Sequence, residues 1–427
     1  MSSVLRSVRK RKKGRRLGEV EIVSREEYDE FELDSKVEAI RALIPLGLMH
    51  VKELLDQEVT ELAGERYTRK EVSLRGRRHG SNPGTVGLAG QRVSIRVPRV
   101  RSVTGIEIPL RSYEAFSRDH EANDLLLKRV LYGISCRNYE AAAGSIPGAI
   151  GLSSSTVSRG FIEASATKLR ELQERDLSGE DVVAVFLDGK TFADATMVVA
   201  LGITISGGKR FLGFVETDTE NEKVLTPFLR SLVERGLDAS QGLLVILDGG
   251  KGLRSAVKKV FRDRALVQRC QWHKRENVVS YLARSEQADW RRRLQRAYDR
   301  PTYKEALAAL EQLHRELQDR NQSAAASLAE GLEETLTLHR LGLYAVLGRS
   351  LKTTNCLESV NALVEERCAK VDHWKNSSQR HRWLATALVE IEPRLRKVMG
   401  HRHLPALRQA LQSALKIGKQ VSKKKVA

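Results

Sequence analysis

The chain has 427 residues, 41% of them hydrophobic, which is enough for several domains with at least one sizeable core. Its formal net charge of +19 points to a polyanionic partner, either a nucleic acid or an anionic membrane surface. Because no apolar run approaches the ~18 residues of a membrane span, no secretory signal is visible, and the four scattered cysteines are typical of reduced thiols, we expect a cytoplasmic protein that binds DNA or RNA and no membrane.

Positive charge is concentrated near the N-terminus. Residues 1–16 hold eight lysines and arginines and no acid, so residues 1–35 are predicted to be a basic disordered tail, although such tails often serve only solubility. Residues 36–120 are predicted to form a DNA-binding region that starts with one or two helices and continues into an Arg-rich β-ribbon. The ribbon is indicated by strand-like alternation at Val93, Ile95 and Val97, within an acid-free segment. Loops are predicted at Gly80, Pro83, Gly84, Gly87 and Gly90, and the candidate DNA contacts are Arg75, Arg77, Arg78, Arg96, Arg99 and Arg101.

Residues 121–178 have the pattern of a helix-turn-helix. A helix over 123–132 and a short one over 137–143 precede a glycine-containing turn, after which a longer helix opens at Ser154. In that motif, small polar and arginine side chains at the start of the recognition helix reach base edges and phosphates. An ordinary helical hairpin with a capped N-terminus is the alternative. The candidate DNA contacts here are Ser154, Ser155, Thr156 and Arg159.

The sequence pattern changes near Asp181, where short apolar runs typical of buried strands begin. Strands are predicted over 182–187, 197–205, 210–215, 243–247 and 265–269, with helices over 223–235 and 253–261. This order predicts an α/β RNase H-like catalytic core, whose first part covers residues 179–276. An all-α insertion is predicted over 277–347, final core helices over 348–400, and a basic C-terminal tail over 401–427.

Three carboxylates could form a metal centre. Asp188 and Asp248 each follow a buried strand and precede a glycine, and the carboxyl ends of strands in α/β sheets are where sites collect. The third is expected at Glu358 on the last core helix, with Asn355 as its N-cap and Asn361 on the same face. Glu358 could instead be only a capping residue, and Glu365 and Glu366 are rivals. Two Mg²⁺ ions, with Mn²⁺ tolerated, would suit phosphoryl transfer at such a centre.

Cys270 and His273 have the spacing of half a zinc site, but no second pair of ligands is evident at a suitable spacing. We therefore predict that they lie near the carboxylates and support the site, rather than bind zinc. Trp272 between them could stack on an unpaired base, although core packing is the favoured prediction.

Four separated motifs occur in an order that resembles the Mutator-type transposases of bacterial insertion sequences. They are Leu187-Asp188-Gly189, Ile246-Leu247-Asp248-Gly249, Arg269-Cys270-Gln271-Trp272-His273-Lys274 and Thr354-Asn355-Cys356-Leu357-Glu358-Ser359-Val360-Asn361. The resemblance implies a catalytic and metal-binding Asp-Asp-Glu triad of Asp188, Asp248 and Glu358, supported by Cys270, His273 and Asn361.

The resemblance also implies a function. Such enzymes use water to cut at terminal inverted repeats, and the freed 3′ hydroxyl then attacks target DNA. Pairing of two ends implies at least a homodimer in the bacterial cytoplasm. Two alternatives stay open: an RNase H-like nuclease or resolvase that cuts without joining, and a DNA-binding regulator derived from a transposase.

Overall fold

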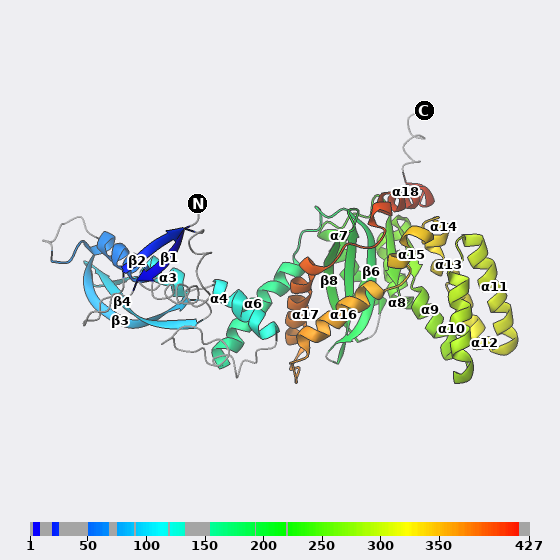
Figure 1. The fold of residues 1–427 in the computed structure, drawn as a ribbon, viewed down its shortest axis with the longest axis horizontal. Coiled ribbons are helices and arrows are strands. Elements are labelled where there is room, and N and C mark those ends of the chain that lie inside the picture. The colour runs from blue at the N-terminus through cyan, green and yellow to red at the C-terminus, as the bar shows by residue number, and fades with distance from the viewer. Residues whose placement is uncertain are drawn as a thin grey trace, which may run out of the picture. The chain divides into compact units, whose positions relative to one another are not determined.

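The computed structural model describes residues 3–8, 19–24, 50–67, 75–88, 91–117, 120–132, 154–192, 194–218 and 221–417. The chain folds as two compact units, Met1–Phe161 and Ile162–Ala427 (Figure 1). Throughout these described ranges, no helix is both long enough and apolar enough to cross a bilayer.

A long antiparallel ribbon organises the first unit. Strand β3 (Gly76–Leu88) pairs with β4 (Gln91–Ser102), and β5 (Glu107–Ile108) adds a short third strand at the other edge of β4. Residues 50–63 form a helix that packs its apolar side on the ribbon. The buried contacts are made by Val51, Leu55, Val59, Val86, Val93 and Val100. The strand predicted from the alternation of valine and isoleucine is therefore present as β4.

The glycines and proline that predicted loops lie within β3, so that prediction is wrong for Gly80, Pro83, Gly84 and Gly87. β3 is an edge strand, where a proline leaves no ladder hydrogen bond unmade. Gly80, with φ of +74°, lies at a bulge in the register. A Cβ at Gly84 would lie 2.5 Å from a methyl of Val97, so the strand requires glycine there because of close packing. Gly90 lies outside the described residues.

The prediction of a disordered N-terminal tail is wrong in part. Strands β1 (Ser3–Val8) and β2 (Glu19–Ser24) pair antiparallel within it, with Arg6 opposite Glu21 in the register. The basic run that suggested disorder falls between the two strands, whereas the strands themselves are rich in β-branched residues.

Among the described residues, the ribbon is followed by helices α3 (Arg111–Ser117), α4 (His120–Leu131) and α6 (Ser154–Gln173). The predicted helices over 123–132 and from Ser154 onwards correspond to α4 and α6. The intervening helix and turn of the predicted helix-turn-helix, residues 133–153, lie outside the described residues, so that motif stays a prediction.

A five-stranded mixed sheet forms the centre of the second unit. Its order is β10-β9-β6-β7-β8, in which β6, β7 and β8 are antiparallel and β6, β9 and β10 are parallel. The strands are β6 (Val182–Phe192), β7 (Ala195–Thr204), β8 (Lys209–Thr217), β9 (Leu243–Leu247) and β10 (Ala265–Arg269). The predicted strands are all present, and the unit is a mixed α/β fold with a large helical part.

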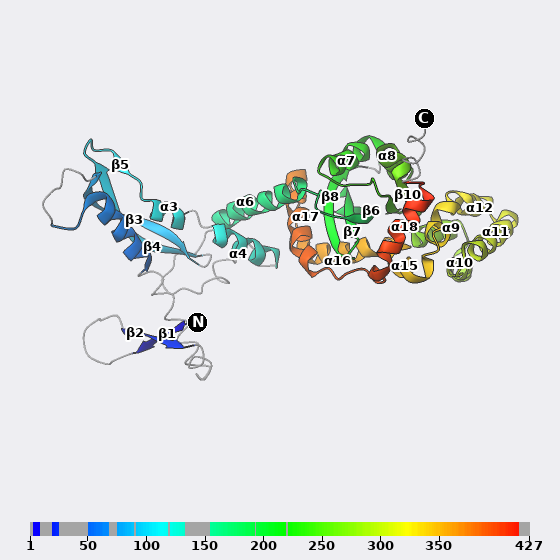
Figure 2. The ribbon, with the colours of Figure 1, turned by 90° about the horizontal axis from the view of Figure 1, so that it is seen from above.

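Helices cover both faces of this sheet (Figure 2). Helices α7 (Glu222–Glu234) and α8 (Lys251–Phe261), followed by η1 (Arg262–Arg264), pack on the face that carries Val198 and Ala200. On the other face lie α16 (Asn355–Cys368) and α17 (Ser377–Ile391), where Leu384 approaches Met197 and Val199. Side chains of successive strand residues thus divide between two helical layers.

A helical region runs from the end of β10 to the start of α16. Its elements are α9 (Gln271–Ser280), α10 (Arg284–Tyr298), α11 (Tyr303–Arg320), α12 (Gln322–Ala329), α13 (Leu332–Thr335), α14 (Thr337–Arg340) and α15 (Tyr344–Leu351). Helices α9 to α13 share an apolar core of their own.

Buried polar contacts join this helical region to the sheet. The side chain of Gln268 on β10 is fully buried, and its Nε2 donates to the carbonyl of Thr335 at 2.8 Å. Its Oε1 accepts from the backbone N–H of Leu338 at 2.9 Å. One glutamine therefore satisfies two backbone groups that have no access to water.

The C-terminal segment is not only the basic tail that was predicted. After η2 (Glu392–Arg394) and η3 (His401–His403), α18 (Leu404–Ala414) buries three leucines completely. They are Leu404, Leu407 and Leu411, at helical spacing. The prediction gave too much weight to the terminal lysines, and residues 418–427 lie outside the described part of the chain.

We predict that Gln268→Leu weakens the docking of the helical region. Leucine has a similar volume but leaves the Leu338 N–H without its partner and removes one of the two side-chain donors to the Thr335 carbonyl, the other being Gln271. The free energy of unfolding should therefore fall by about 1–3 kcal/mol. Urea unfolding followed by circular dichroism measures this. Gln312→Leu, on the exposed side of α11, is the control and should change little. Equal stability of the two variants would contradict the assigned role of Gln268.

Candidate active site

Asp188 and Asp248 lie side by side because two neighbouring strands are parallel. Leu187 of β6 pairs in register with Leu247, the last residue of β9, so each aspartate is the residue that follows this pair. Neighbouring strands lie ~4.8 Å apart, which brings the two positions within reach of a shared ligand. Asp188 is buried at 8% exposure, whereas Asp248 is half-buried.

The sequence predicts that Asp188 follows its strand, but in the structure Asp188 lies within β6. β6 continues to Phe192, because β7 pairs with it over its whole length while β9 stops at Leu247. Asp188 therefore pairs with Val199 of β7 and lies one residue beyond the last pair of β6 with β9. Since Leu187 contributes to the core under α7 and α8, alternation directs Asp188 to the sheet face that α16 covers.

The Arg269 guanidinium packs closely against the loop that follows the second aspartate. Asp248 Oδ1 accepts from the N–H of Gly250 at 2.9 Å, and Gly249 has φ of +105°. A Cβ at Gly249 would collide with the Arg269 guanidinium, which is itself buried and donates to the carbonyl of Glu330 at 2.9 Å. Only glycine fits between Asp248 and this arginine.

Cys270 and His273 lie at the start of α9, directly after β10. The N–H of Cys270 donates to the carbonyl of Leu247 at 2.7 Å, which fixes the start of α9 at the end of β9. The hydroxyl of Thr354 lies 3.7 Å from Cys270 Sγ and 3.4 Å from His273 Nδ1. These two residues therefore contact the residue that precedes α16.

The charges of both aspartates influence the protonation of His273. Burial opposes its protonation, but the hydrogen bond and charge of Cys270 and the carboxylates of Asp188 and Asp248 together raise the pKa of His273 to about 9. Burial likewise opposes ionisation of Cys270, yet its hydrogen bond to His273 holds the pKa of the thiol below its usual value. An imidazolium thus faces two carboxylates at neutral pH.

Helix α16 starts one residue earlier than the predicted cap implies. Thr354 is the N-cap residue, Asn355 is the first helical residue, and the N–H of Glu358 donates to the carbonyl of Thr354 at 3.2 Å. The Thr354 side chain makes no capping bond because it faces Cys270 and His273. The prediction of Asn355 as the N-cap is wrong, since local capping preference did not include this tertiary contact.

Glu358 is exposed, and its carboxylate has no hydrogen bond or ion pair with the described residues. Its rivals have partners: Glu365 lies 2.5 Å from Lys190 Nζ, and Glu366 lies 2.8 Å from Arg367 Nη1. Asn361 lines a small cavity together with Lys190 and Glu365. Glu358 is thus the carboxylate of α16 that is left available.

The described residues do not bring all three carboxylates into one ligand set. Within those ranges no three His, Cys, Asp or Glu side chains are grouped closely enough to hold a metal ion. The same finding leaves Cys270 and His273 without the further ligands that a structural zinc site needs. The two aspartates are adjacent, and Glu358 lies apart from them.

Trp272 differs from the favoured prediction of core packing, because its side chain is 41% exposed. Its ring meets that of His273 edge to face, with centroids 4.8 Å apart. Gln271 and Lys274 of the same motif were assigned no role from the sequence, and both side chains are buried. Their place in the family motif, and their polarity in a helix that follows a buried strand, were the signals that pointed to them.

The candidate DNA-binding arginines divide into two groups. Arg75, Arg77 and Arg96 are exposed and have no partner among the described residues. The others are engaged by the protein: Arg78 donates to Thr60 and to the carbonyl of Gly64, Arg99 pairs with Glu107 at 2.6 Å, and Arg101 contacts His79.

The candidate contacts at the start of α6 lie on its first turns. Ser154, Ser155 and Arg159 are exposed, Thr156 is half-buried, and Val157 is buried between them.

Comparisons with known proteins agree with the sequence motifs. The family described as "Transposase, Mutator family" matches residues 19–396. The transposase for insertion sequence element IS256 in transposon Tn4001 of Staphylococcus aureus is 25% identical over 358 residues, which cover 79% of this chain and 87% of that protein. The transposase for insertion sequence element IS406 of Burkholderia multivorans is 28% identical over 376 residues, with 84% and 91% covered. That for IS6120 of Mycolicibacterium smegmatis is 27% identical over 287 residues, with 66% and 87% covered. These matches confirm the resemblance predicted from the motifs: the chain belongs to the Mutator family of transposases.

Proposed function

We propose that this transposase cuts and joins DNA with an Asp-Asp-Glu triad formed by Asp188, Asp248 and Glu358. The observation that carries the proposal is the register of β6 and β9, which makes the two aspartates neighbours at the end of a parallel strand pair. The sheet order β10-β9-β6-β7-β8, with its antiparallel half formed by β6 to β8, supports an RNase H-like core. The substrates are the terminal inverted repeats of an insertion sequence and a target DNA.

The donor set fits a hard divalent cation. Asp188 and Asp248 supply carboxylate oxygens from adjacent backbone positions, and Mg²⁺ prefers oxygen ligands while it keeps several waters. Two such ions, Mg²⁺ or Mn²⁺, would polarise the scissile phosphate and lower the pKa of the attacking hydroxyl or water. Both cutting and joining are in-line attacks on a phosphodiester, so one set of residues serves both.

Glu358 completes the triad when α16 moves towards the aspartates on binding metal and DNA. Thr354, Glu358, Asn361 and Glu365 form one stripe along the helix. Thr354 contacts His273, while Asn361 and Glu365 border Lys190, two residues beyond Asp188. On this stripe Glu358 lies one turn from Thr354 and one turn from Asn361, so a shift of this part of α16 is the movement that we propose.

We expect Asp188→Asn, Asp248→Asn and Glu358→Gln each to abolish nicking and joining of labelled element ends, because each removes a charged ligand and keeps the side-chain shape. A loss of at least 10³-fold is expected, since removal of one member of a catalytic unit usually costs ~10³–10⁶-fold. End binding in EDTA, measured by electrophoretic mobility shift, should persist.

The matched controls for Glu358→Gln are Glu365→Gln and Glu366→Gln on the same helix. Both should retain cleavage, because their carboxylates pair with Lys190 and Arg367. Cleavage that survives Glu358→Gln but is lost in Glu365→Gln would assign the third ligand to Glu365. Binding without cleavage by the unaltered protein under every metal tested would contradict the proposed reaction.

His273 is proposed as a positioning residue, supported by Cys270 and by Asn361 of α16. It carries positive charge beside the aspartates and contacts Thr354, so it can orient both the carboxylates and the start of α16. His273→Ala should lower strand joining far more than end binding. Quantitative joining assays beside binding isotherms measure the two effects. His314→Ala, in helix α11 of the helical region, is the control; a normal joining rate for His273→Ala would remove the proposed role.

DNA binding is proposed for the ribbon of the first unit and for the start of α6. The exposed arginines Arg77 and Arg96 are the best candidates for phosphate contacts, because the half-buried ones are bound within the protein. Since two ends must be paired before joining, we propose that the active form is at least a dimer.

Arg77→Ala and Arg96→Ala should each weaken binding to element ends and reduce the slope of log K against log salt by about 1. Arg99→Ala should change the slope less, because its guanidinium is already held by Glu107 at 2.7 and 2.6 Å. Fluorescence anisotropy at several salt concentrations gives the slopes. Identical slopes for all three variants and the unaltered protein would exclude the ribbon as a phosphate-binding element.

A further inference from the structure

A pocket of about 390 Å³ lies beside the proposed active site. Its walls come from α9, α10, α15 and the turn into α16, including Gln271, Trp272, Asp299, Tyr344 and Asn355. The pocket adjoins the active site because Trp272 precedes His273 in the chain and Asn355 follows Thr354, which contacts His273. The volume falls in the ~300–1,000 Å³ range of pockets that hold one small organic group.

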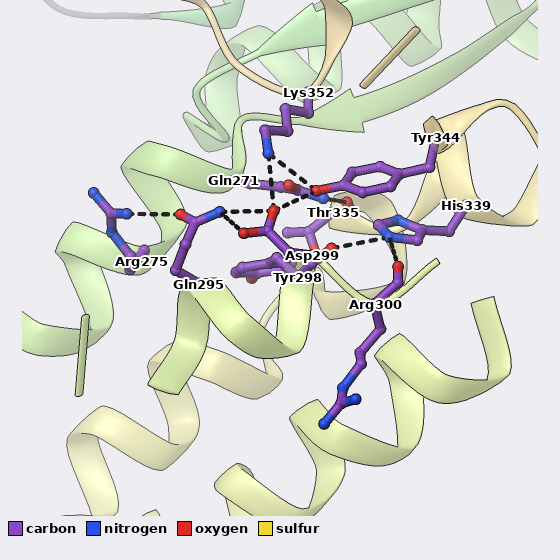
Figure 3. A network of polar contacts seen from close by, with 10 residues as sticks. All are labelled: Gln271, Arg275, Gln295, Tyr298, Asp299, Arg300, Thr335, His339, Tyr344 and Lys352. Carbon is purple, nitrogen blue, oxygen red and sulfur yellow. Dashed lines mark hydrogen bonds and ion pairs between the residues drawn. The ribbon is translucent and has the colours of Figure 1, made fainter. Parts of the chain in front are cut away.

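One wall of the pocket is a fixed polar network (Figure 3). Asp299 accepts from Gln295 Nε2 at 2.9 Å, from the Tyr344 hydroxyl at 2.9 Å and from Lys352 Nζ at 3.1 Å. The Tyr344 ring is stacked on His339 with centroids 3.7 Å apart. The carboxylate is thus neutralised by its own partners, and the wall is preformed without strong negative charge.

Gln271 carries an unmet acceptor in this wall. Its side chain is 4% exposed, and its Nε2 donates to the Thr335 carbonyl at 2.9 Å, which fixes the orientation of the amide. Its Oε1 is buried and has no hydrogen-bond partner in the described part of the chain. An unpaired buried acceptor costs free energy. Because Gln271 lines the pocket, a donor that enters the pocket would remove this cost.

Trp272 supplies an aromatic surface at the mouth. Its side chain is 41% exposed although it lies between buried Gln271 and half-buried His273. An exposed flat ring beside a phosphodiester-cutting site suits base stacking, because every base has a π-face. Arg349, also on the pocket wall, is exposed and makes no ion pair with the described residues, so it is available to a phosphate.

We propose that this pocket receives one unpaired nucleotide of the DNA next to the scissile bond, with its base stacked on Trp272. An exocyclic amino group of the base would donate to Gln271 Oε1, and Arg349 would face its phosphate. This rests on the proposed function, and it adds a step: the end is locally unpaired before it is cut. Adenine, cytosine and guanine carry this amino donor, whereas an unpaired thymine would have to donate through its N3–H instead.

The test is single-turnover cleavage of element ends by Trp272→Ala, on fully paired DNA and on DNA with one mismatched pair scanned across the cleavage site. On paired ends Trp272→Ala should cut roughly 5- to 150-fold more slowly, which corresponds to loss of one base stack. A mismatch at one position should restore most of the rate, because that base is already unpaired. Trp272→Phe should remain close to the unaltered protein.

Tyr281→Ala is the matched control, since Tyr281 is another exposed aromatic residue, directly after the same helix. A second readout is independent of cleavage: 2-aminopurine at the rescuing position should change fluorescence on binding Glu358→Gln protein, and the change should be lost when Trp272→Ala is added.

Two results would overturn the proposal: paired-end cleavage by Trp272→Ala at the unaltered rate, or a defect that no mismatch relieves. Failure of the proposed function itself looks different, because the unaltered protein would then cut neither kind of DNA.

Discussion

Two carboxylates at adjacent backbone positions repel each other, and the second unit depends on keeping them together. The parallel register of β6 and β9 fixes Asp188 next to Asp248 whether or not their charges are compensated. The runs that precede them, Val182–Leu187 and Leu243–Leu247, are buried on both faces, so packing energy supports an arrangement that electrostatics alone disfavours. Compensation then comes from His273, whose imidazolium faces both carboxylates, and from the metal ions that we propose for the site.

The helical region explains how a glutamate 110 residues beyond Asp248 (358 − 248 = 110) can serve the same centre. The region leaves the sheet at Cys270, whose N–H is bonded to Leu247, and returns at Lys352, whose carbonyl accepts from Gln271 at 3.0 Å. Its exit and return are therefore adjacent. The long insertion adds a folded body without changing the spacing between the sheet edge and α16.

Much of this fold could be predicted from periodicity, because the strands of the core are short continuous apolar runs. β9 and β10 have the predicted bounds, 243–247 and 265–269. β9 lies between Gly242 and Asp248, and β10 follows the charged residue Arg264. β6 runs five residues beyond Leu187 because its length is set by pairing with β7, which is a tertiary property. The glycines of β3 were misjudged for the same reason: close packing against Val97 requires glycine at Gly84, and the sequence does not display that contact.

Some features of the candidate site could likewise be predicted from the sequence, and others could not. The aspartates could be predicted from their strands and from the family motifs, and the contact between Thr354 and His273 could not. That contact takes the threonine hydroxyl away from capping and makes Asn355 the first residue of α16. Trp272 was misjudged because an aromatic residue between buried neighbours usually packs inside, whereas here it borders a pocket. The contact of Thr354 with His273 has no local signature, since the two residues are 81 positions apart in the chain.

The central claim is that Asp188, Asp248 and Glu358 bind the same metal pair once DNA is present. The most direct measurement replaces Mg²⁺ with Fe²⁺ in the complex with element-end DNA, generates hydroxyl radicals at the bound iron, and maps the sites of backbone cleavage by mass spectrometry. Our account predicts cleavage around residues 188 and 248 with or without DNA, and around residue 358 only when DNA is bound. Cleavage of α16 around residues 365–366 instead, or no cleavage in α16 under any condition, would contradict it.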